Sequence, residues 1–345
     1  MALVIATSVV KKRFILAGLC VLAALASAFA RADVPVPSWP YGTDPAWRAA
    51  AKLPGGERVF DELERNLAPL DPYAPPDRYP NDHPPMPELV ARGSKADHVL
   101  ACALCHHPDG YGRPENADLR GLRADYIVKQ LEAFKNGERW SADPAKANTR
   151  TMISAAKGLT HAEMLAVAAY YAGLHPWQSH ERVVESSKAP DVWSDRTGAV
   201  FALAPPNNGW APLAHAIVEI PQDAVQSEVY HDPREIYVVY APPGSVERGK
   251  LLAATASCGA CHGGDLGGSE IAPPLAGRSA SYIARQLFDI QRGTRRDAPA
   301  MIAVVAHLTP DDVVDLAAYL ASLGSKDRAH GASPVSWLGS KPSRS

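Results

Sequence analysis

The sequence has no excess of positive charge and lacks the low hydrophobic content of a disordered chain. Its 345 residues carry 35 Lys and Arg against 37 Asp and Glu, a formal net charge of -2. A protein that holds a polyphosphate chain needs clustered cations, so nucleic acid is excluded as an expected partner. With 46% hydrophobic residues the chain is too apolar to be disordered throughout, and its length predicts two folded domains.

Long apolar runs are also absent, apart from one at the N-terminus. That run covers residues 14–26, follows three cations at 11–13 and ends on small residues in an A-x-A pattern. This order is typical of a cleaved export signal, and the run is shorter than the about 20 apolar residues of a membrane anchor. We therefore predict a signal peptide at 1–32 and a periplasmic protein. An uncleaved signal that keeps the protein on the membrane is the alternative.

Cysteine is scarce, and none is spare once Cys20 leaves with the signal. The other four form two C-x-x-C-H motifs: Cys102, Cys105 and His106, then Cys258, Cys261 and His262. This is the signature of c-type haem attachment, since two thiols three residues apart can form thioethers to one porphyrin. The histidine that follows then lies beneath the iron. Two covalently attached c-type haems are predicted; a redox dithiol or a zinc site is the alternative.

The two motifs belong to a duplicated segment. An offset of 156 residues carries the first motif, the Tyr-Ile and Gln-Leu pairs and Gly137 onto the second copy, and the offset becomes 149 further on. In each copy an apolar stripe, Ile127 and Leu131 in the first, predicts a middle helix that stops at a glycine. Thr160 and Thr309 begin a closing helix with a capping signal, and its small residues predict close packing on the opening helix.

Methionine is scarce as well, with five in the chain. A neutral thioether suits an electron carrier as the sixth iron ligand, because it favours ferrous iron and raises the potential. Met301 is the only methionine after position 164, and Met152 occupies the matching place in the first copy. We predict both on a loop before the closing helix. Met164 is predicted to pack in the core. The alternative ligands are Met86, Met164, His161 and His307.

On these motifs each repeat resembles a class I cytochrome c domain, and the pair resembles the dihaem cytochrome c4 family. The similarity covers about 90–174 and 246–323. It implies two tandem cytochrome c domains. Together with the long stretch between the repeats, this predicts a mainly α fold of two tandem cytochrome c domains joined by a long linker with some β structure. It also implies electron transfer with no substrate of its own. By resemblance, the haem-binding residues are Cys102, Cys105, His106 and Met152 for one haem, and Cys258, Cys261, His262 and Met301 for the other, with His106, Met152, His262 and Met301 on iron.

The linker departs from that family. The predicted parts are a signal peptide 1–32, a Pro-rich arm 33–87, a cytochrome c domain 88–175, a linker 176–245, a second cytochrome c domain 246–325 and a flexible tail 326–345. The arm is expected to wrap the surface with one helix near 57–67, and alternating residues at 216–220 and 235–240 predict strands in the linker. About 70 intervening residues leave direct packing of the two haems in doubt.

A second departure concerns the proximal histidines. Pro273 or Pro274 matches the family's proline, whose carbonyl orients the histidine, but the first copy has Ala117 and Asp118 there. We therefore expect this hydrogen bond, and with it the two haem potentials, to differ. The side chains that either contact haem propionates or line the pockets are Tyr126, Tyr282, Gln130, Gln286 and Arg278. His107 is predicted to face solvent.

The predicted function is transfer of single electrons, not catalysis. The protein would act as a shuttle or cytochrome subunit between redox partner proteins, namely an exported dehydrogenase, a membrane electron-transport chain or an oxidase. It would meet the membrane only through partners or an uncleaved signal. The alternative is a dihaem enzyme such as a peroxidase or a thiosulfate-oxidising cytochrome. That alternative needs a vacant iron position or a sulfur-reactive side chain, whereas both irons have a methionine in the expected place.

Overall fold

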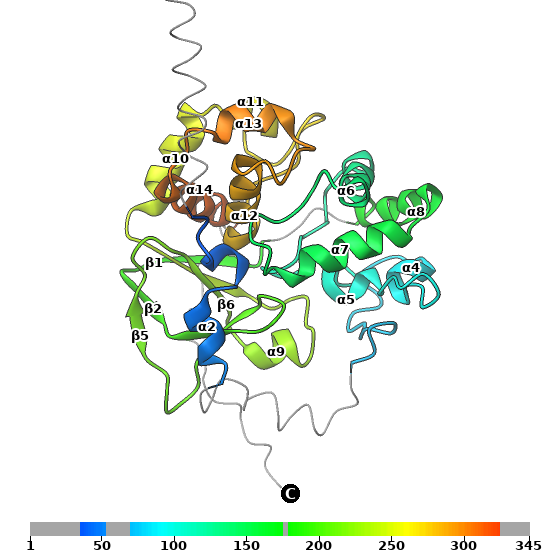
Figure 1. The fold of residues 1–345 in the computed structure, drawn as a ribbon, viewed down its shortest axis with the longest axis horizontal. Coiled ribbons are helices and arrows are strands. Elements are labelled where there is room, and N and C mark those ends of the chain that lie inside the picture. Colours follow the sequence, from blue (N-terminus) through cyan, green and yellow to red (C-terminus); the bar gives the residue numbers. More distant parts are fainter. Residues whose placement is uncertain (1–34, 53–69, 175–178, 325–345) are drawn as a thin grey trace, which may run out of the picture. The chain divides into compact units, whose positions relative to one another are not determined.

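The computed structural model describes residues 35–52, 70–174 and 179–324. The predicted signal peptide, the helix expected near 57–67 and the tail lie outside these residues. All contacts reported below lie within the compact unit that begins at Pro37. Figure 1 shows that the helices of each repeat cluster together and that the linker strands form a separate group. Within the described ranges, no helix is long and apolar enough to cross a membrane.

The two repeats contain the same helices in the same order. The first repeat, residues 88–174, has α4 (Glu88–Ala91), α5 (Cys102–His106), α6 (Ala124–Asn136), α7 (Ala147–Gly158) and α8 (His161–Ala172). The second repeat, residues 245–324, has α10 (Ser245–Thr255), α11 (Gly259–His262), α12 (Ala280–Gln291), α13 (Pro299–Val305) and α14 (Pro310–Ser322). The predicted mainly α fold of two tandem domains is confirmed.

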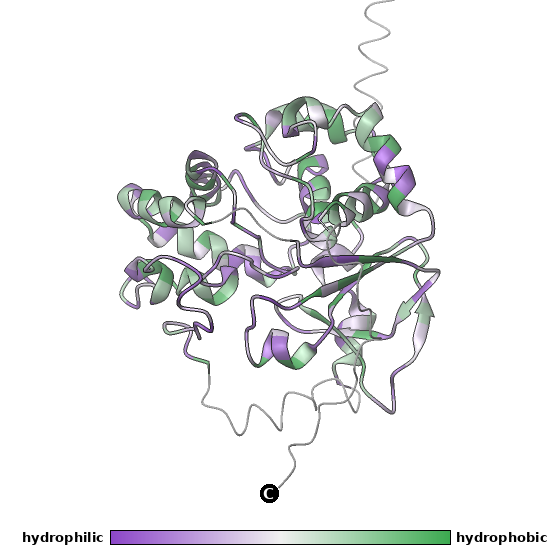
Figure 2. Cartoon of the chain, turned by 180° about the vertical axis from the view of Figure 1, so that it is seen from behind, coloured by the Kyte–Doolittle hydropathy of each residue, from purple (hydrophilic) through white to green (hydrophobic). Residues whose placement is uncertain are grey.

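Local sequence signals set the ends of these helices as predicted. Helix α6 buries Ile127 and Leu131 and ends at Gly137, whose φ of 74° is the left-handed conformation that glycine adopts freely. Helices α8 and α14 each begin with a capping box, from Thr160 and Thr309 respectively. In Figure 2 the helices of both repeats carry hydrophobic and hydrophilic sides, as expected of helices with one buried face.

The closing helix packs tightly on the opening helix in the second repeat. A Cβ atom on Gly249 of α10 would lie 2.0 Å from the carbonyl oxygen of Asp315 on α14, so only glycine fits there. Arg248 beside it forms a 2.7 Å ion pair with the Asp315 carboxylate. The alanines of α14 at 317, 318 and 321 are fully buried, which confirms their predicted packing role.

The methionine segments differ from the prediction. They are helices rather than loops, because Met152 lies within α7 and Met301 within α13. In α7 the residues Ile153 and Ala156 are buried. Helix α13 begins with Pro299, a favoured first helical residue. Because these segments contain helix-forming residues and bury one face, they form helices where a loop between the middle and closing helices is expected.

The linker forms a small β domain between the repeats. Strands β1 (Glu181–Glu185), β7 (Tyr237–Ala241) and β6 (Val218–Pro221) make one sheet, in which β7 pairs in parallel with β1 and antiparallel with β6. Two antiparallel pairs and one helix complete the domain: β2 (Lys188–Pro190) with β5 (Trp210–Pro212), β3 (Val192–Ser194) with β4 (Val200–Ala202), and α9 (Ala224–Glu228). Both predicted strands are present, as β6 and β7, and every residue in them is buried.

The N-terminal arm reaches the second repeat. It contains the short 3-10 helix η1 (Trp39–Tyr41) and α2 (Pro45–Ala50). The buried Tyr41 hydroxyl donates a 2.9 Å hydrogen bond to Asp289 of α12, and Arg285 of the same helix donates to the Pro40 carbonyl at 2.7 Å. The described part of the arm is therefore anchored by buried hydrogen bonds.

Candidate functional site

Each C-x-x-C-H motif folds into a short helix that places its histidine inside the repeat. Nδ1 of His106 lies 2.7 Å from the carbonyl oxygen of Ala117, and Nδ1 of His262 lies 2.7 Å from that of Pro273. This bond holds the proton on Nδ1 and leaves Nε2 with the lone pair that could bind a metal. Burial lowers the pKa of both histidines, which keeps the imidazoles neutral. The expected difference in this hydrogen bond is wrong, because any residue can offer a carbonyl.

The first motif opens into a large, mainly apolar cavity of about 1360 Å³, counted out to its open mouth. Both cysteines of the motif, His106 and Met152 line this space together. The apolar walls are Leu119, Leu122, Ile127, Leu131, Phe134, Leu159, Val167 and Tyr171. A wide apolar space with two thiols and one imidazole at its edge fits a flat macrocycle attached through thioethers.

The second motif offers the same donors. Nε2 of His262 is buried and has no hydrogen-bond partner among the described residues. A buried imidazole nitrogen without a partner is costly unless something binds it. This orphaned atom fits an iron ligand. Met301 lies half-buried on α13, and the structure leaves its predicted role on iron as a prediction.

Both thiols of the first motif and Cys258 of the second lack the low pKa of a redox dithiol. Burial, with Cys105 nearby, raises the pKa of Cys102 to about 12. Burial also raises the pKa of Cys105 and of Cys258. A reactive dithiol needs the opposite shift, toward thiolate. For the zinc alternative, the ranges that the structure covers contain no group of three or more His, Cys, Asp or Glu side chains arranged around a metal position.

The competing ligands do not line the first cavity. Met164 is 1% exposed in the core of the first repeat, as predicted, and Met86 packs against the same core. His161 is largely exposed beside Glu132, and His307 is exposed. None of these four lines the cavity at His106. Met152 is therefore the methionine that the fold brings to the first histidine.

The prediction that His107 faces solvent is wrong. The His107 side chain is 2% exposed, and neither ring nitrogen has a hydrogen-bond partner within the described ranges. Its ring lies 6.4 Å from that of His231 in the linker domain, measured between centroids. Burial lowers the pKa of His107 well below its ordinary value, so the ring is neutral. The linker domain covers His107. The residues next to His107 in the sequence do not indicate this contact, which comes from a distant part of the chain.

The predicted polar side chains meet two arginines that the sequence reasoning missed. Arg139 donates hydrogen bonds to Gln130 in its own repeat at 2.5 Å and to Gln286 in the other at 2.8 Å. Arg295 donates to Gln286 at 2.8 Å, and across the repeats to Tyr126 at 2.8 Å and Gln130 at 3.2 Å. The backbones of the two arginines also pair as an antiparallel bridge. The 156-residue offset could have found them, since it equates Arg139 with Arg295.

This arginine cluster (Gln130, Arg139, Gln286, Arg295 and Asp297, with the two tyrosines) joins the repeats directly. The long linker therefore does not hold them apart. Arg139 lines the first cavity, and among the described residues no carboxylate forms an ion pair with it. A haem propionate is a fitting partner for this buried guanidinium. Arg278, also a predicted propionate partner, instead pairs with Asp118 of the first repeat at 3.1 Å.

Comparisons with known proteins find similar sequences and domains. The cytochrome c family model matches residues 90–174 and 246–324. A relative from Stutzerimonas stutzeri strain A1501, named thiosulfate dehydrogenase electron acceptor, is 27% identical over 245 residues, 70% of this chain and 87% of that protein. Cytochrome c4 from Pseudomonas aeruginosa is 42% identical over 91 residues, 26% of this chain and 43% of that protein. The solved structure of reduced recombinant cytochrome c4 from Pseudomonas stutzeri is 21% identical, covers 66% of this chain and 97% of that chain, and has a TM-score of 0.40.

Two matched domains, each with a haem-attachment motif, define a c-type cytochrome with two haem domains. The chain is a dihaem class I c-type cytochrome that resembles the cytochrome c4 family. Its cofactors are two covalently attached c-type haems, whose iron takes up and releases single electrons. Relatives named as cytochrome c4 or as an electron acceptor indicate electron transfer rather than catalysis.

Proposed function

We propose that this protein is an exported, periplasmic dihaem cytochrome that passes single electrons between redox partner proteins. It does so as a shuttle or as the cytochrome subunit of a dehydrogenase or respiratory chain. The observation that carries the proposal is the direct contact of two haem repeats through the buried arginine cluster. Two haem repeats in contact suit electron passage through the protein, because electron transfer slows steeply as the protein layer between centres thickens.

The proposed ligands are the predicted ones, and the cavity that Cys102, Cys105, His106 and Met152 line together supports the first set. Thioethers from Cys102 and Cys105 hold one haem, with His106 and Met152 on its iron. Cys258 and Cys261 hold the other, with His262 and Met301. The chain's own residues orient the imidazoles through backbone carbonyls, exclude water with apolar walls and supply cations for the propionates. Both irons are then six-coordinate, which leaves no position for a substrate.

A thiosulfate-oxidising enzyme is a fitting donor class, since two relatives are named as electron acceptors of thiosulfate dehydrogenase. The signal-like N-terminus supports export. The competing function, a dihaem enzyme, requires an iron that binds exogenous ligands or a direct reaction with substrate.

The test uses the holoprotein matured with a haem-lyase system. Each ferric haem is expected to show the thioether-to-iron charge-transfer band, and neither ferrous haem should bind carbon monoxide. Thiosulfate alone should leave the haems oxidised, whereas addition of a thiosulfate dehydrogenase should reduce them. Uptake of carbon monoxide, or direct reduction by thiosulfate, would instead establish the enzyme.

A further inference from the structure

The duplication provides an internal comparison of the two haem-attachment loops. In the first repeat, no residue of Cys102–Asp118 is exposed. The equivalent stretch of the second repeat, 258–274, contains seven exposed residues: Ala260, Cys261, Gly264, Asp265, Gly267, Glu270 and Ile271. The two loops share length and motif, so the difference comes from what packs against them.

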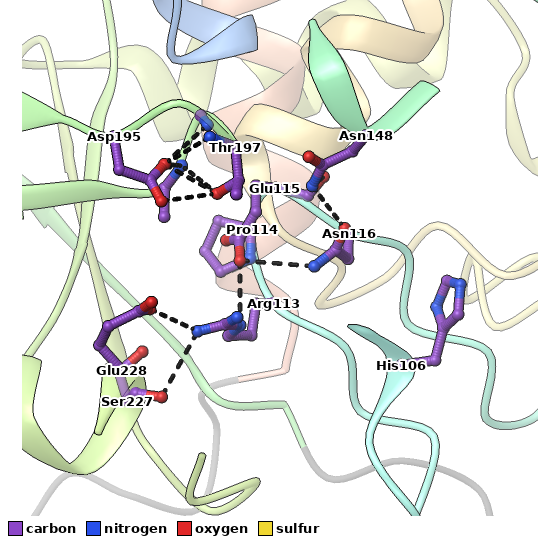
Figure 3. Close-up of polar contacts among 12 residues, drawn as sticks. His106, Arg113, Pro114, Glu115, Asn116, Asn148, Asp195, Thr197, Ser227 and Glu228 are labelled. Atoms are coloured by element: carbon purple, nitrogen blue, oxygen red, sulfur yellow. Dashed lines mark hydrogen bonds and ion pairs between the residues drawn. The ribbon is translucent and has the colours of Figure 1, made fainter. Parts of the chain in front are cut away.

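The first loop is covered by the linker domain on one side. Arg113 forms a 2.7 Å ion pair with Glu228 of α9, and its side chain also donates to the Ser227 carbonyl at 3.4 Å. Figure 3 shows Arg113 reaching these two residues from the loop that follows His106. The ring of Tyr111 stacks on His180, with 3.7 Å between centroids.

The second repeat covers the same loop from another direction. Arg285 of α12 donates a hydrogen bond to the Pro114 carbonyl at 2.5 Å, and Arg278 donates to the Asp118 carbonyl at 2.6 Å. The cover also confines His107, whose backbone has φ 61° and ψ 158°, a region that is essentially restricted to glycine. Its equivalent is Gly263, with φ 86° and ψ 149°. The attachment loop of the first repeat is therefore covered on the side of His107.

The exposed loop contains residues that do not stabilise the fold in their exposed positions. Ile271 is 77% exposed, whereas its equivalent Glu115 is 5% exposed and pairs with Arg113 at 2.9 Å. Leaving an isoleucine in water forgoes about 2 kcal/mol of burial. The loop also carries two carboxylates, Asp265 and Glu270, and no Lys or Arg. Glu270 pairs with Arg123 of the first repeat, but the two side chains are 87% and 44% exposed, so this contact is weak.

We propose that the loop 258–274 is the docking surface for the redox partner, a protein whose own face is apolar and cationic. This proposal rests on the proposed function. It assigns the protein a single entrance, meaning that electrons are exchanged with the partner only at the loop 258–274. Each encounter moves one electron between partner and second repeat, and no bond forms and no proton moves. The first repeat exchanges electrons by way of the second, because its own attachment loop lies beneath the linker domain.

The first test maps binding without electron transfer. Tris(phenanthroline)chromium(III), an apolar trication that is redox-inert and paramagnetic, is added to the ferrous holoprotein, and the broadening of backbone amide NMR signals is measured. We expect broadening at 264–271 and none at 107–116. Replacing Ile271 by Glu should strengthen it. Leu165→Glu, a matched change at a residue 51% exposed on α8, should leave the loop signals unchanged. Equal broadening of both loops would overturn the single entrance.

The second test measures electron exchange with the cobalt(III) analogue and with ferricyanide. A new carboxylate about 8 Å from a probe of charge three changes the encounter rate by about threefold at 0.15 M salt. Ile271→Glu should therefore speed oxidation by the cobalt complex and slow oxidation by ferricyanide. Both haems should change by the same factor, and Leu165→Glu should change neither. If the oxidation rate of one haem did not change in Ile271→Glu, the single entrance would be disproved. Haems that exchange with neither probe would disprove the proposed function as well.

Discussion

Replacement of Asp297 by asparagine removes the carboxylate from the arginine cluster between the repeats. The Asp297 side chain is 1% exposed, lies 3.4 Å from Nε of Arg295 and accepts a 2.8 Å hydrogen bond from Gln130. Burial by itself raises the pKa of Asp297, but Arg295, Arg139 and Gln130 outweigh burial and hold the pKa below its usual range. The group is therefore ionised in the folded protein and compensates a buried cation.

Removing one partner of a buried ion pair costs about 3–5 kcal/mol, because the other charge stays buried. Arg295 keeps its hydrogen bonds to Gln286 and Tyr126, so we expect the lower end, a loss of about 3 kcal/mol in unfolding free energy. The measurement is urea unfolding of the holoprotein, followed by haem absorbance and by circular dichroism.

The duplication supplies the control. Ser141 is the equivalent of Asp297 in the first repeat and lines the first cavity. Ser141→Asp added to Asp297→Asn moves the carboxylate to the other half of the cluster at unchanged net charge. The double variant should recover more than half of the lost stability. If Asp297 did not compensate Arg295, its carboxylate would act as an ordinary surface charge. Asp297→Asn would then change the unfolding free energy by less than about 0.5 kcal/mol, which would contradict the prediction.

The same variant should change the redox potentials. At a separation on the order of 12 Å and an effective dielectric of about 20, one charge contributes about 1.4 kcal/mol, which is about 60 mV for a one-electron couple. Loss of an anion disfavours ferric iron, so Asp297→Asn should raise at least one midpoint potential by tens of millivolts in a spectroelectrochemical titration. Unchanged potentials together with unchanged stability would refute the assigned role of Asp297.

Three other predictions test the ligands, the linker domain and the helix contact. Met152→Leu should halve the thioether-to-iron charge-transfer band, whereas Met164→Leu should keep the full band and cost less than about 1.5 kcal/mol. Burial raises the pKa of Glu235 from 4.5 to about 7, so the folded state binds the extra proton between these values and stability falls as pH rises through them. Relative to Glu235→Gln, the fall should approach roughly 3 kcal/mol between pH 4.5 and 7 in urea unfolding, and parallel pH profiles would contradict it. Gly249→Ala should destabilise by about 2 kcal/mol in the same assay, while Gly264→Ala, where nothing lies within 4 Å of the added Cβ, should be close to neutral.

Local signals in the sequence predict most of the helical framework. The stop at Gly137 and the capping boxes at Thr160 and Thr309 depend on residues within one helical turn, and the structure has each of them. The linker strands also follow from their own residues. The features that the sequence does not predict depend on contacts between residues far apart in the chain, such as the burial of His107 beside His231 and the pairing of Arg139 with Arg295.

The candidate site divides in the same way. The attachment cysteines and proximal histidines are readable because thioether chemistry needs a short, fixed spacing. The methionine segments were placed correctly along the chain but expected as loops, since their helical residues carry no strong capping signal. The expected difference at Ala117 failed for another reason: a backbone carbonyl is available from any residue, so the hydrogen bond is indifferent to the side chain.

The two haem environments nevertheless differ, and the differences agree in direction. Ferric haem iron carries more positive charge than ferrous, so burial in a low dielectric favours the ferrous form and raises the potential. The first attachment loop is buried and the second is exposed. The first cavity is also lined by two guanidinium cations, Arg139 and Arg285, by Lys146, whose pKa burial lowers to about 7, and by two carboxylates, Glu115 and Asp289, so its lining carries a small positive excess at most. From both effects we expect the higher potential in the first repeat. An electron that enters at the exposed second repeat would then move downhill to the covered one, which would make the proposed single entrance and the expected unequal potentials parts of one arrangement.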